Sequence, residues 1–196
     1  MNYKIIRGTR EDLDRAEQGD LSFALWGTTY TPECHFYGVY NEDGFVFRLT
    51  CREKDPRITY LTPGGEVCED SCLEFFCNFA PHKTNAFINF EMNAGGAWLF
   101  GIGPDRYQRT DLSHTAGFTV EAERNAESWQ VTLTVPKTEL EKLYGPLTLE
   151  KGVILTGNVY KCGDLTEEPH YLSWSNMNPK VLDFHRPDRF GTFELT

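Results

Sequence analysis

Short apolar runs separated by glycine, proline, asparagine and aspartate are the feature that most limits how this chain can fold. From Phe23 to the C-terminus, ten such runs follow one another, and each has a length typical of β-strands. This spacing predicts an all-β fold, a jelly-roll or immunoglobulin-like β-sandwich. The runs cover residues 23–26, 35–40, 44–52, 71–79, 86–93, 97–102, 117–123, 129–135, 152–161 and 191–195.

One or two short surface helices are expected beside the strands. Thr9 can cap a helix in which Leu13 and Ala16 share one face, and a second helix is expected over residues 136–144, which start with proline and are followed by glycine. The 196 residues show no linker and no internal repeat. We therefore expect a single domain over residues 1–196, with its core over about 20–196.

The charge of the chain argues against two classes of partner. The formal net charge is -10 and the basic residues are scattered, so a nucleic-acid backbone would be repelled. No apolar stretch is long enough to span a membrane. Residues 1–7 also lack the apolar segment of a signal peptide. The protein is expected in the cytoplasm if the chain is the whole gene product, and outside the cell if a leader was removed.

The six cysteines could form three disulfides or remain free thiols. A domain of this size can fold without cross-links, which favours free thiols. Cys68, Cys72 and Cys77 lack the Cys-x2-Cys spacing of structural zinc sites, so zinc is not expected. No cofactor is therefore predicted, with calcium as the one alternative, because four carboxylates could offer it hard oxygen ligands. These are Glu66, Glu69, Asp70 and Asp111.

A predicted hairpin brings together the polar residues best suited to bind a ligand. Glu74 alternates with core residues in the run 71–79, and Glu91 does so in the run 86–93. A turn centred near residues 82 and 83 places the two glutamates directly opposite each other, with Cβ atoms about 5 Å apart. A shift of two residues would place Asn89 or Asn93 opposite Glu74 instead. The alternative to a binding site is a solvated polar face.

The position of Trp98 depends on the next turn. A two-residue turn after Asn93 would bring Trp98 onto the face of Glu91, whereas a three-residue turn would direct it into the core. Aromatic rings can stack on the apolar C–H faces of sugars, while carboxylates and amides hydrogen-bond to sugar hydroxyls. The composition of this face therefore suits a carbohydrate ligand.

Four segments together resemble the family 9 carbohydrate-binding modules. They are Asp-Ser-Cys-Leu-Glu-Phe-Phe at 70–76, Asn-Phe-Glu-Met-Asn at 89–93, the tryptophan-led strand 129–136, and Trp174 with the ending 185–191. The resemblance covers the chain from about Trp26 to the C-terminus. It implies a jelly-roll-like sandwich that holds a sugar, often the end of a sugar chain, between two tryptophans.

The resemblance also implies roles for individual residues. Trp174 stands in the place of the second tryptophan, and Glu74 matches the carboxylate of the Asp-Ser-x-x-Glu strand. The first tryptophan would precede Asp70, where this sequence has Val-Cys-Glu, so only one stacking ring is expected. Arg186 could bind a ligand or brace a loop. The expected ligand-binding residues are Trp174, Glu74, Glu91, Asn89, Asn93, Trp98 and Arg186.

Non-catalytic carbohydrate binding is the function that these observations favour, with a role beside a glycoside hydrolase as one setting. One alternative is a glycoside-active enzyme in which Glu74 and Glu91 serve as acid and as base or nucleophile. Another is a scaffold domain that has kept the sandwich and lost its sugar site.

Overall fold

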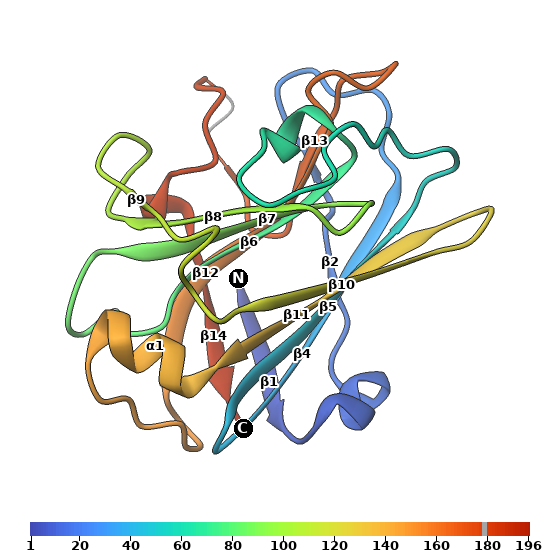
Figure 1. Cartoon of the computed structure of the whole chain (residues 1–196). Helices are drawn as coiled ribbons and strands as arrows, with labels where there is room; N and C mark the ends of the chain where they lie inside the picture. Colours follow the sequence, from blue (N-terminus) through green and yellow to red (C-terminus); the bar gives the residue numbers. More distant parts are fainter. Residues whose placement is uncertain (178–179) are drawn as a thin grey trace.

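The computed structural model describes residues 1–177 and 180–196. Its strands form a curled sheet that folds back on itself as two packed layers, which confirms the predicted β-sandwich (Figure 1). The strands are β1 (Asn2–Arg7), β2 (Gly19–Asp20), β3 (Phe23–Ala24), β4 (Glu33–Asn41), β5 (Gly44–Arg52), β6 (Cys72–Asn78), β7 (Phe87–Asn93), β8 (Trp98–Gly103), β9 (Thr110–Asp111), β10 (Thr119–Arg124), β11 (Trp129–Pro136), β12 (Ile154–Cys162), β13 (Tyr171–Ser173) and β14 (Gly191–Leu195).

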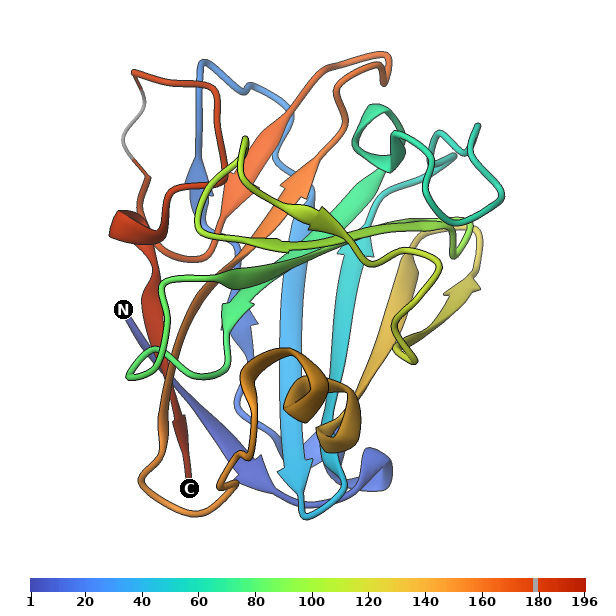
Figure 2. The same ribbon diagram turned by 60° about the vertical axis from the view of Figure 1, so that its left-hand side comes forward.

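One layer contains β10, β11, β5 and β4, and the other contains β14, β12, β6, β7, β8 and β9, in these orders. Strand β1 joins the layers, because its first part pairs in parallel with β14 and its last two residues pair in parallel with β4. Figure 2 shows β1 and β14 at one side of the molecule, where the N- and C-termini both lie.

Each of the ten predicted apolar runs contains a strand, but β1 was not predicted. Tyr3 and Ile5 of β1 are 1% and 0% exposed. The core therefore begins before the expected boundary near residue 20. The apolar residues of β1 alternate with Asn2 and Lys4, and the strand changes partner halfway along, so it leaves only a weak sequence signal.

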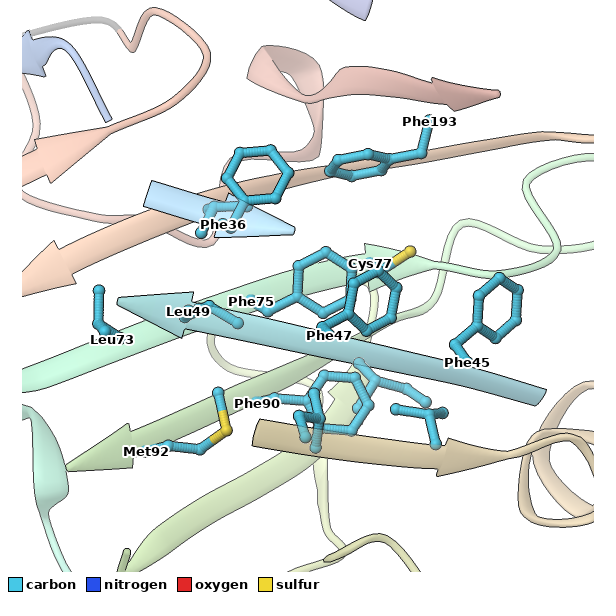
Figure 3. Packing of buried hydrophobic residues seen from close by; sticks show 14 of the residues in the cluster. Phe36, Phe45, Phe47, Leu49, Leu73, Phe75, Cys77, Phe90, Met92 and Phe193 are labelled. Carbon is cyan, nitrogen blue, oxygen red and sulfur yellow. The ribbon is translucent and has the colours of Figure 1, made fainter. Parts of the chain in front are cut away.

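The main core lies between the two layers and is rich in phenylalanine (Figure 3). Phe47 of β5 and Phe75 of β6 meet across the sandwich with ring centroids 4.2 Å apart. Phe75 also lies 5.6 Å from Phe193 of β14. Burying each ring contributes about 1.5–3 kcal/mol, so these contacts hold β6 firmly against the opposite layer.

Both predicted helices are present at the expected positions, but the first is a 3-10 helix. The segment after Thr9 forms a short 3-10 helix, η1 (Arg10–Arg15), in which Asp12 accepts a hydrogen bond of 3.0 Å from the Thr9 amide. Helix α1 (Lys137–Tyr144) follows Pro136 and ends at Gly145, whose φ of 72° suits glycine. Two further 3-10 helices are η2 (Val67–Glu69) and η3 (Pro187–Arg189).

A second apolar cluster covers the outer face of β6, β7 and β12. Phe76, Phe87 and Tyr160 point away from the main core and are at most 1% exposed. Phe184 from the C-terminal segment covers them, stacking on Tyr160 with centroids 4.1 Å apart. The face that the sequence predicted as polar and outward is therefore enclosed, and every residue of β6 and β7 is buried.

A buried ionic network lies on the other side of β12. The Lys161 ammonium lies 2.6 Å from His170 Nε2, donates to the carbonyl of Cys162, and lies 3.4 Å from Glu53. His170 Nδ1 lies 2.7 Å from the Glu168 carbonyl, which places the ring proton on Nδ1 and leaves Nε2 as the acceptor for Lys161. Burial and the Lys161 charge both lower the pKa of His170.

We expect this network to make folding stability depend on pH. An unfolded histidine titrates near pH 6.5. The pKa of His170 is lower in the folded state. Its contribution to folding stability is therefore complete above the unfolded pKa, and it is lost as the pH falls from the unfolded pKa to the folded pKa. On acidification, the unfolding free energy of His170→Gln should therefore fall less steeply than that of the wild type, with a difference in slope of up to about 1.4 kcal/mol per pH unit. Urea unfolding between pH 7.5 and 5.5, a range of about two pH units around the histidine value, measures both slopes; equal slopes would contradict the assignment.

Candidate functional site

The β6–β7 hairpin has the predicted register. Glu74 lies directly opposite Glu91, and the neighbouring pairs Phe75–Phe90 and Leu73–Met92 point into the main core. The two glutamates are 3% and 4% exposed. Strand alternation thus places two carboxylates side by side on a face that the apolar cluster closes almost completely.

These glutamates lie at the floor of a pocket of about 630 Å³, including its open mouth. Walls come from the segment after β3, from η2, from the loop after β8, from the end of β12 and its following loop, and from the C-terminal segment. The lining residues are Trp26, Glu66, Cys68, Glu74, Glu91, Leu99, Arg106, Arg109, Cys162, Asp164, Tyr171, Leu182, Asp183, Phe184 and His185.

Glu91 is partly neutralised by its neighbours. Asn89 donates a hydrogen bond of 2.8 Å to Glu91 Oε1, and an Arg109 nitrogen lies 3.5 Å from the same oxygen. Burial raises the pKa of Glu91, while the charge of Arg109 opposes the rise. Glu91 is therefore the carboxylate of the pair that the site best supports in its ionised form.

Fewer neighbouring groups stabilise the ionised form of Glu74. Burial raises its pKa well above the ordinary value, and the charge of Glu91 raises it further. The Cys162 thiol donates a hydrogen bond of 2.9 Å to Glu74 Oε1. The pair thus favours a state in which Glu74 holds a proton and Glu91 carries the negative charge. Such a pair both donates and accepts hydrogen bonds.

A chain of charged groups extends from Glu91 to the pocket mouth. Arg109 contacts His185 Nε2, and His185 Nδ1 lies 3.1 Å from Asp183. The Asp183 carboxylate also accepts a hydrogen bond of 2.9 Å from the His185 amide. Burial would raise the pKa of Asp183, but its hydrogen bonds and the charge of His185 give a net lowering. Arg109 is thereby fixed where its guanidinium can face a ligand.

An aromatic wall stands beside this polar floor. Trp26 lies 5.2 Å, between ring centroids, from both Tyr171 and Phe184. The Trp26 backbone has a φ of 52°, a left-handed conformation that is unusual for a bulky residue. Strained backbone of this kind often occurs at functional sites. Here it places the only tryptophan that lines the pocket within the described chain.

Trp174 does not reach this pocket, so its expected role in sugar stacking needs correction. It is 3% exposed and belongs to the main core. Its ring stacks on Phe193 with centroids 5.0 Å apart and meets Tyr3 and Phe36 edge-on. A ligand cannot stack on a ring whose faces are already covered by the core. Trp174 therefore holds β13 and β14 together.

Trp98 also faces the core. It pairs with Met92, packs on Phe100 with centroids 5.7 Å apart, and donates a hydrogen bond of 3.0 Å to the Ser113 carbonyl. The turn after Asn93 therefore sends Trp98 away from Glu91, as one of the two predicted turns requires. Its neighbour Leu99 lies opposite Glu91 and lines the pocket instead.

The other expected site residues have supporting positions. Asn89 orients Glu91. Asn93, 0% exposed, donates hydrogen bonds to Asp70 and to the Tyr60 carbonyl, and so fixes the loop before η2. Arg186 makes two hydrogen bonds of 2.9 Å to Asp188, which is the bracing role that the sequence left open. None of these three residues lines the pocket of the described chain.

Sequence reasoning missed the loop residues of the site. Arg109 and Asp183 were not identified as candidates, and His185 was considered only as part of the C-terminal segment 185–191 that resembles family 9. Arg109 and His185 are separated by 76 positions and meet through loops without a periodic pattern. One signal could have indicated this loop. Arg106 and Arg109 lie close together in a chain of net charge -10, in the loop that follows a strand paired with β7.

Three of the four carboxylates considered for calcium are used within the fold, and Glu66 lines the pocket. Asp70 accepts hydrogen bonds from the Thr59 and Tyr60 amides, Glu69 from the Tyr60 hydroxyl, and Asp111 from the Ser113 amide. Among the described residues, they do not converge into a group of ligands that could hold an ion. All six cysteines lie within the described chain and are free thiols.

The fold and site define a class of protein: a β-sandwich with a pocket that combines an aromatic wall with charged groups. Residues 10–195 match carbohydrate-binding family 9, and the chain belongs to that family. The family resemblance seen in the sequence is confirmed. No curated protein matched the sequence.

Solved structures show the same fold. A Bacteroides uniformis protein proposed to bind carbohydrate superposes with a TM-score of 0.84 at 24% identity, covering 100% of this chain and 98% of its own. A family 9 carbohydrate-binding module from Caldicellulosiruptor kristjanssonii, in complexes with glucose and with cellotriose, superposes with a TM-score of 0.69 at 9% identity. These two matches cover 100% of this chain and 96% and 94% of the module. Within the described residues, no helix has the length and apolar character needed to cross a membrane.

Proposed function

We propose that the protein binds a sugar, without changing it, in the pocket formed by Trp26, Glu91 and Arg109. The observation that carries this proposal is an aromatic wall that lines the same pocket as the buried Glu91 carboxylate and the half-buried Arg109 guanidinium. A pyranose has apolar C–H faces and a rim of hydroxyls, so it needs both kinds of surface at once. Membership of carbohydrate-binding family 9 and a neighbour that binds glucose and cellotriose support the same assignment.

The shape of the pocket favours the end of a sugar chain over an internal segment. Glu74 and Glu91 close the floor and are almost completely buried, so a ligand can enter only from the mouth. The terminal ring would lie against Trp26 with its hydroxyls directed to Glu91 and Arg109. Further rings would extend past Arg106 and Leu182 toward solvent.

We expect Glu91→Gln to weaken sugar binding about tenfold or more. Hydrogen bonds to charged groups contribute about 1.5–3 kcal/mol, and the amide keeps the shape and the contact with Asn89 but loses the charge facing Arg109. Titration calorimetry with the best-bound oligosaccharide measures the change. Glu123→Gln on β10, outside the pocket lining, is the matched control and should bind as the wild type does. An unchanged affinity for Glu91→Gln would remove Glu91 from the site.

A second candidate function is glycoside hydrolysis, favoured by the directly opposed Glu74 and Glu91. In a retaining mechanism Glu74, which holds its proton, would protonate the leaving group and ionised Glu91 would attack the anomeric carbon. Incubation with aryl glycosides and cello-oligosaccharides tests it. Turnover by the wild type that disappears in both Glu74→Gln and Glu91→Gln would establish the enzyme, whereas binding without turnover supports the non-catalytic function.

A further inference from the structure

The three buried donor groups Cys72, Glu74 and Cys162 come together at the pocket floor. Cys72 and Glu74 are two residues apart on β6 and so share a face, and Cys162 of β12 lies directly opposite Cys72. Their sulfur and carboxylate oxygen atoms all lie within 4.8 Å of one another, with 2.9 Å between Cys162 Sγ and Glu74 Oε1. A tetrahedral zinc site with bonds near 2.3 Å requires sulfur ligands roughly 3.8 Å apart. Small side-chain rotations would therefore complete the geometry.

We propose that Cys72, Glu74 and Cys162 form a binding site for a thiophilic divalent cation of the zinc type. Two sulfur ligands and one carboxylate select zinc over calcium and magnesium, which prefer oxygen ligands alone. The spacing of Cys68, Cys72 and Cys77 along the sequence could not indicate such a site, because the second sulfur comes from a strand 90 positions away in the chain.

An ionised Glu74 would favour a cation at this position. Glu74 is 3% exposed, lies opposite Glu91, and accepts a hydrogen bond from the Cys162 thiol. Arg109 lies against Glu91. The Lys161 ammonium is held by His170, Glu53 and the Cys162 carbonyl. On binding, a cation would displace the proton that Glu74 otherwise holds and the protons of both thiols into solvent, and its charge would compensate the carboxylate and thiolates that result.

The site also has an entrance and an open coordination position. Glu74 and Cys162 line the pocket, so an ion can reach them from solvent. Cys68, half-buried in η2, lines the same pocket, and its carbonyl lies 3.7 Å from Cys162 Sγ. The fourth ligand would be the Cys68 thiol or a water molecule. Three fixed ligands beside an open position are the pattern of metal sites that exchange a ligand.

Cobalt provides the test, because thiolate ligation of Co²⁺ gives a near-ultraviolet charge-transfer band and intense visible bands. We expect the reduced wild-type chain to bind one Co²⁺ with these bands, and Zn²⁺ to displace it. Cys162→Ala and Cys72→Ala should each weaken Co²⁺ binding by more than the roughly 10–100-fold typical of losing an outer hydrogen-bond partner. Glu74→Gln, which keeps both thiols, should retain the charge-transfer band and require more Co²⁺ to reach it.

Cys77→Ala is the matched control, because Cys77 lies on the same strand, is equally buried, and faces the main core away from the pocket. It should bind Co²⁺ as the wild type does. Circular dichroism confirms that each variant is folded. Absence of a thiolate band in the reduced wild type, or a band of equal affinity in Cys162→Ala, would overturn the proposal. Because the readout is metal absorption, its outcome is independent of whether a sugar binds.

Discussion

Trp26→Ala should lower the affinity for the bound sugar by about 30-fold or more, the effect expected when a tryptophan at the centre of a binding site is truncated. Trp26 forms the aromatic wall with Tyr171 and Phe184, and it is the tryptophan that lines the pocket in the described chain. Alanine meets the same backbone cost as tryptophan at a φ of 52°, so the substitution mainly removes the ring. Titration calorimetry on the folded variant measures the loss.

Two variants control this result. Trp26→Phe keeps an aromatic face and should retain part of the affinity. Trp98→Phe changes a tryptophan that packs on Phe100 outside the pocket, and it should bind as the wild type does. Equal affinities for Trp26→Ala and the wild type would show that the sugar stacks elsewhere.

Trp174→Ala should destabilise the fold by about 3–5 kcal/mol, the usual cost of truncating a buried tryptophan. The ring stacks on Phe193 and meets Tyr3 and Phe36, so its removal opens a cavity where β1, β4 and β14 meet. Urea or thermal unfolding measures the change. The folded fraction should keep its sugar affinity, because Trp174 is 3% exposed and is not part of the pocket lining.

Trp174→Phe separates packing from binding at this position. It retains most of the apolar volume, so it should be folded and should bind sugar with wild-type affinity. A stable Trp174→Phe variant with strongly reduced affinity would contradict the core role of Trp174 and restore it to the site.

The sequence allowed the fold to be predicted where a pattern is local. Alternation in β6 and β7 was strong enough to fix which residues face the core, and the same alternation placed Glu74 opposite Glu91. Strand β1 was not predicted, because it pairs in parallel with two distant strands, β14 and β4, and neither pairing produces the sequence signal of a hairpin. The resemblance to family 9 indicated the correct family but not the position of each tryptophan.

The site was only partly predictable for the same reason. Glu74 and Glu91 lie on strands, whereas Arg109 and His185 lie on loops that meet across 76 positions of sequence. The C-terminal segment with Phe184 covers the outer face of β6 and β7, so that this face becomes the enclosed floor of the pocket. The alternation of residues within β6 and β7 could not predict this covering segment. Cys72 and Cys162 likewise become neighbours only when β12 pairs with β6.

The central claim, that this pocket binds a sugar, is tested most directly on a glycan array with the wild type and Leu99→Trp displayed as multivalent complexes, so that weak binding is detected. Leu99 lies opposite Glu91 and lines the pocket, so a larger side chain there would fill the pocket while Trp26 and Glu91 are both retained. The account predicts that the wild type is retained on at least one class of glycan and that folded Leu99→Trp is not. A wild type that binds no glycan, or two proteins that bind equally, would contradict it.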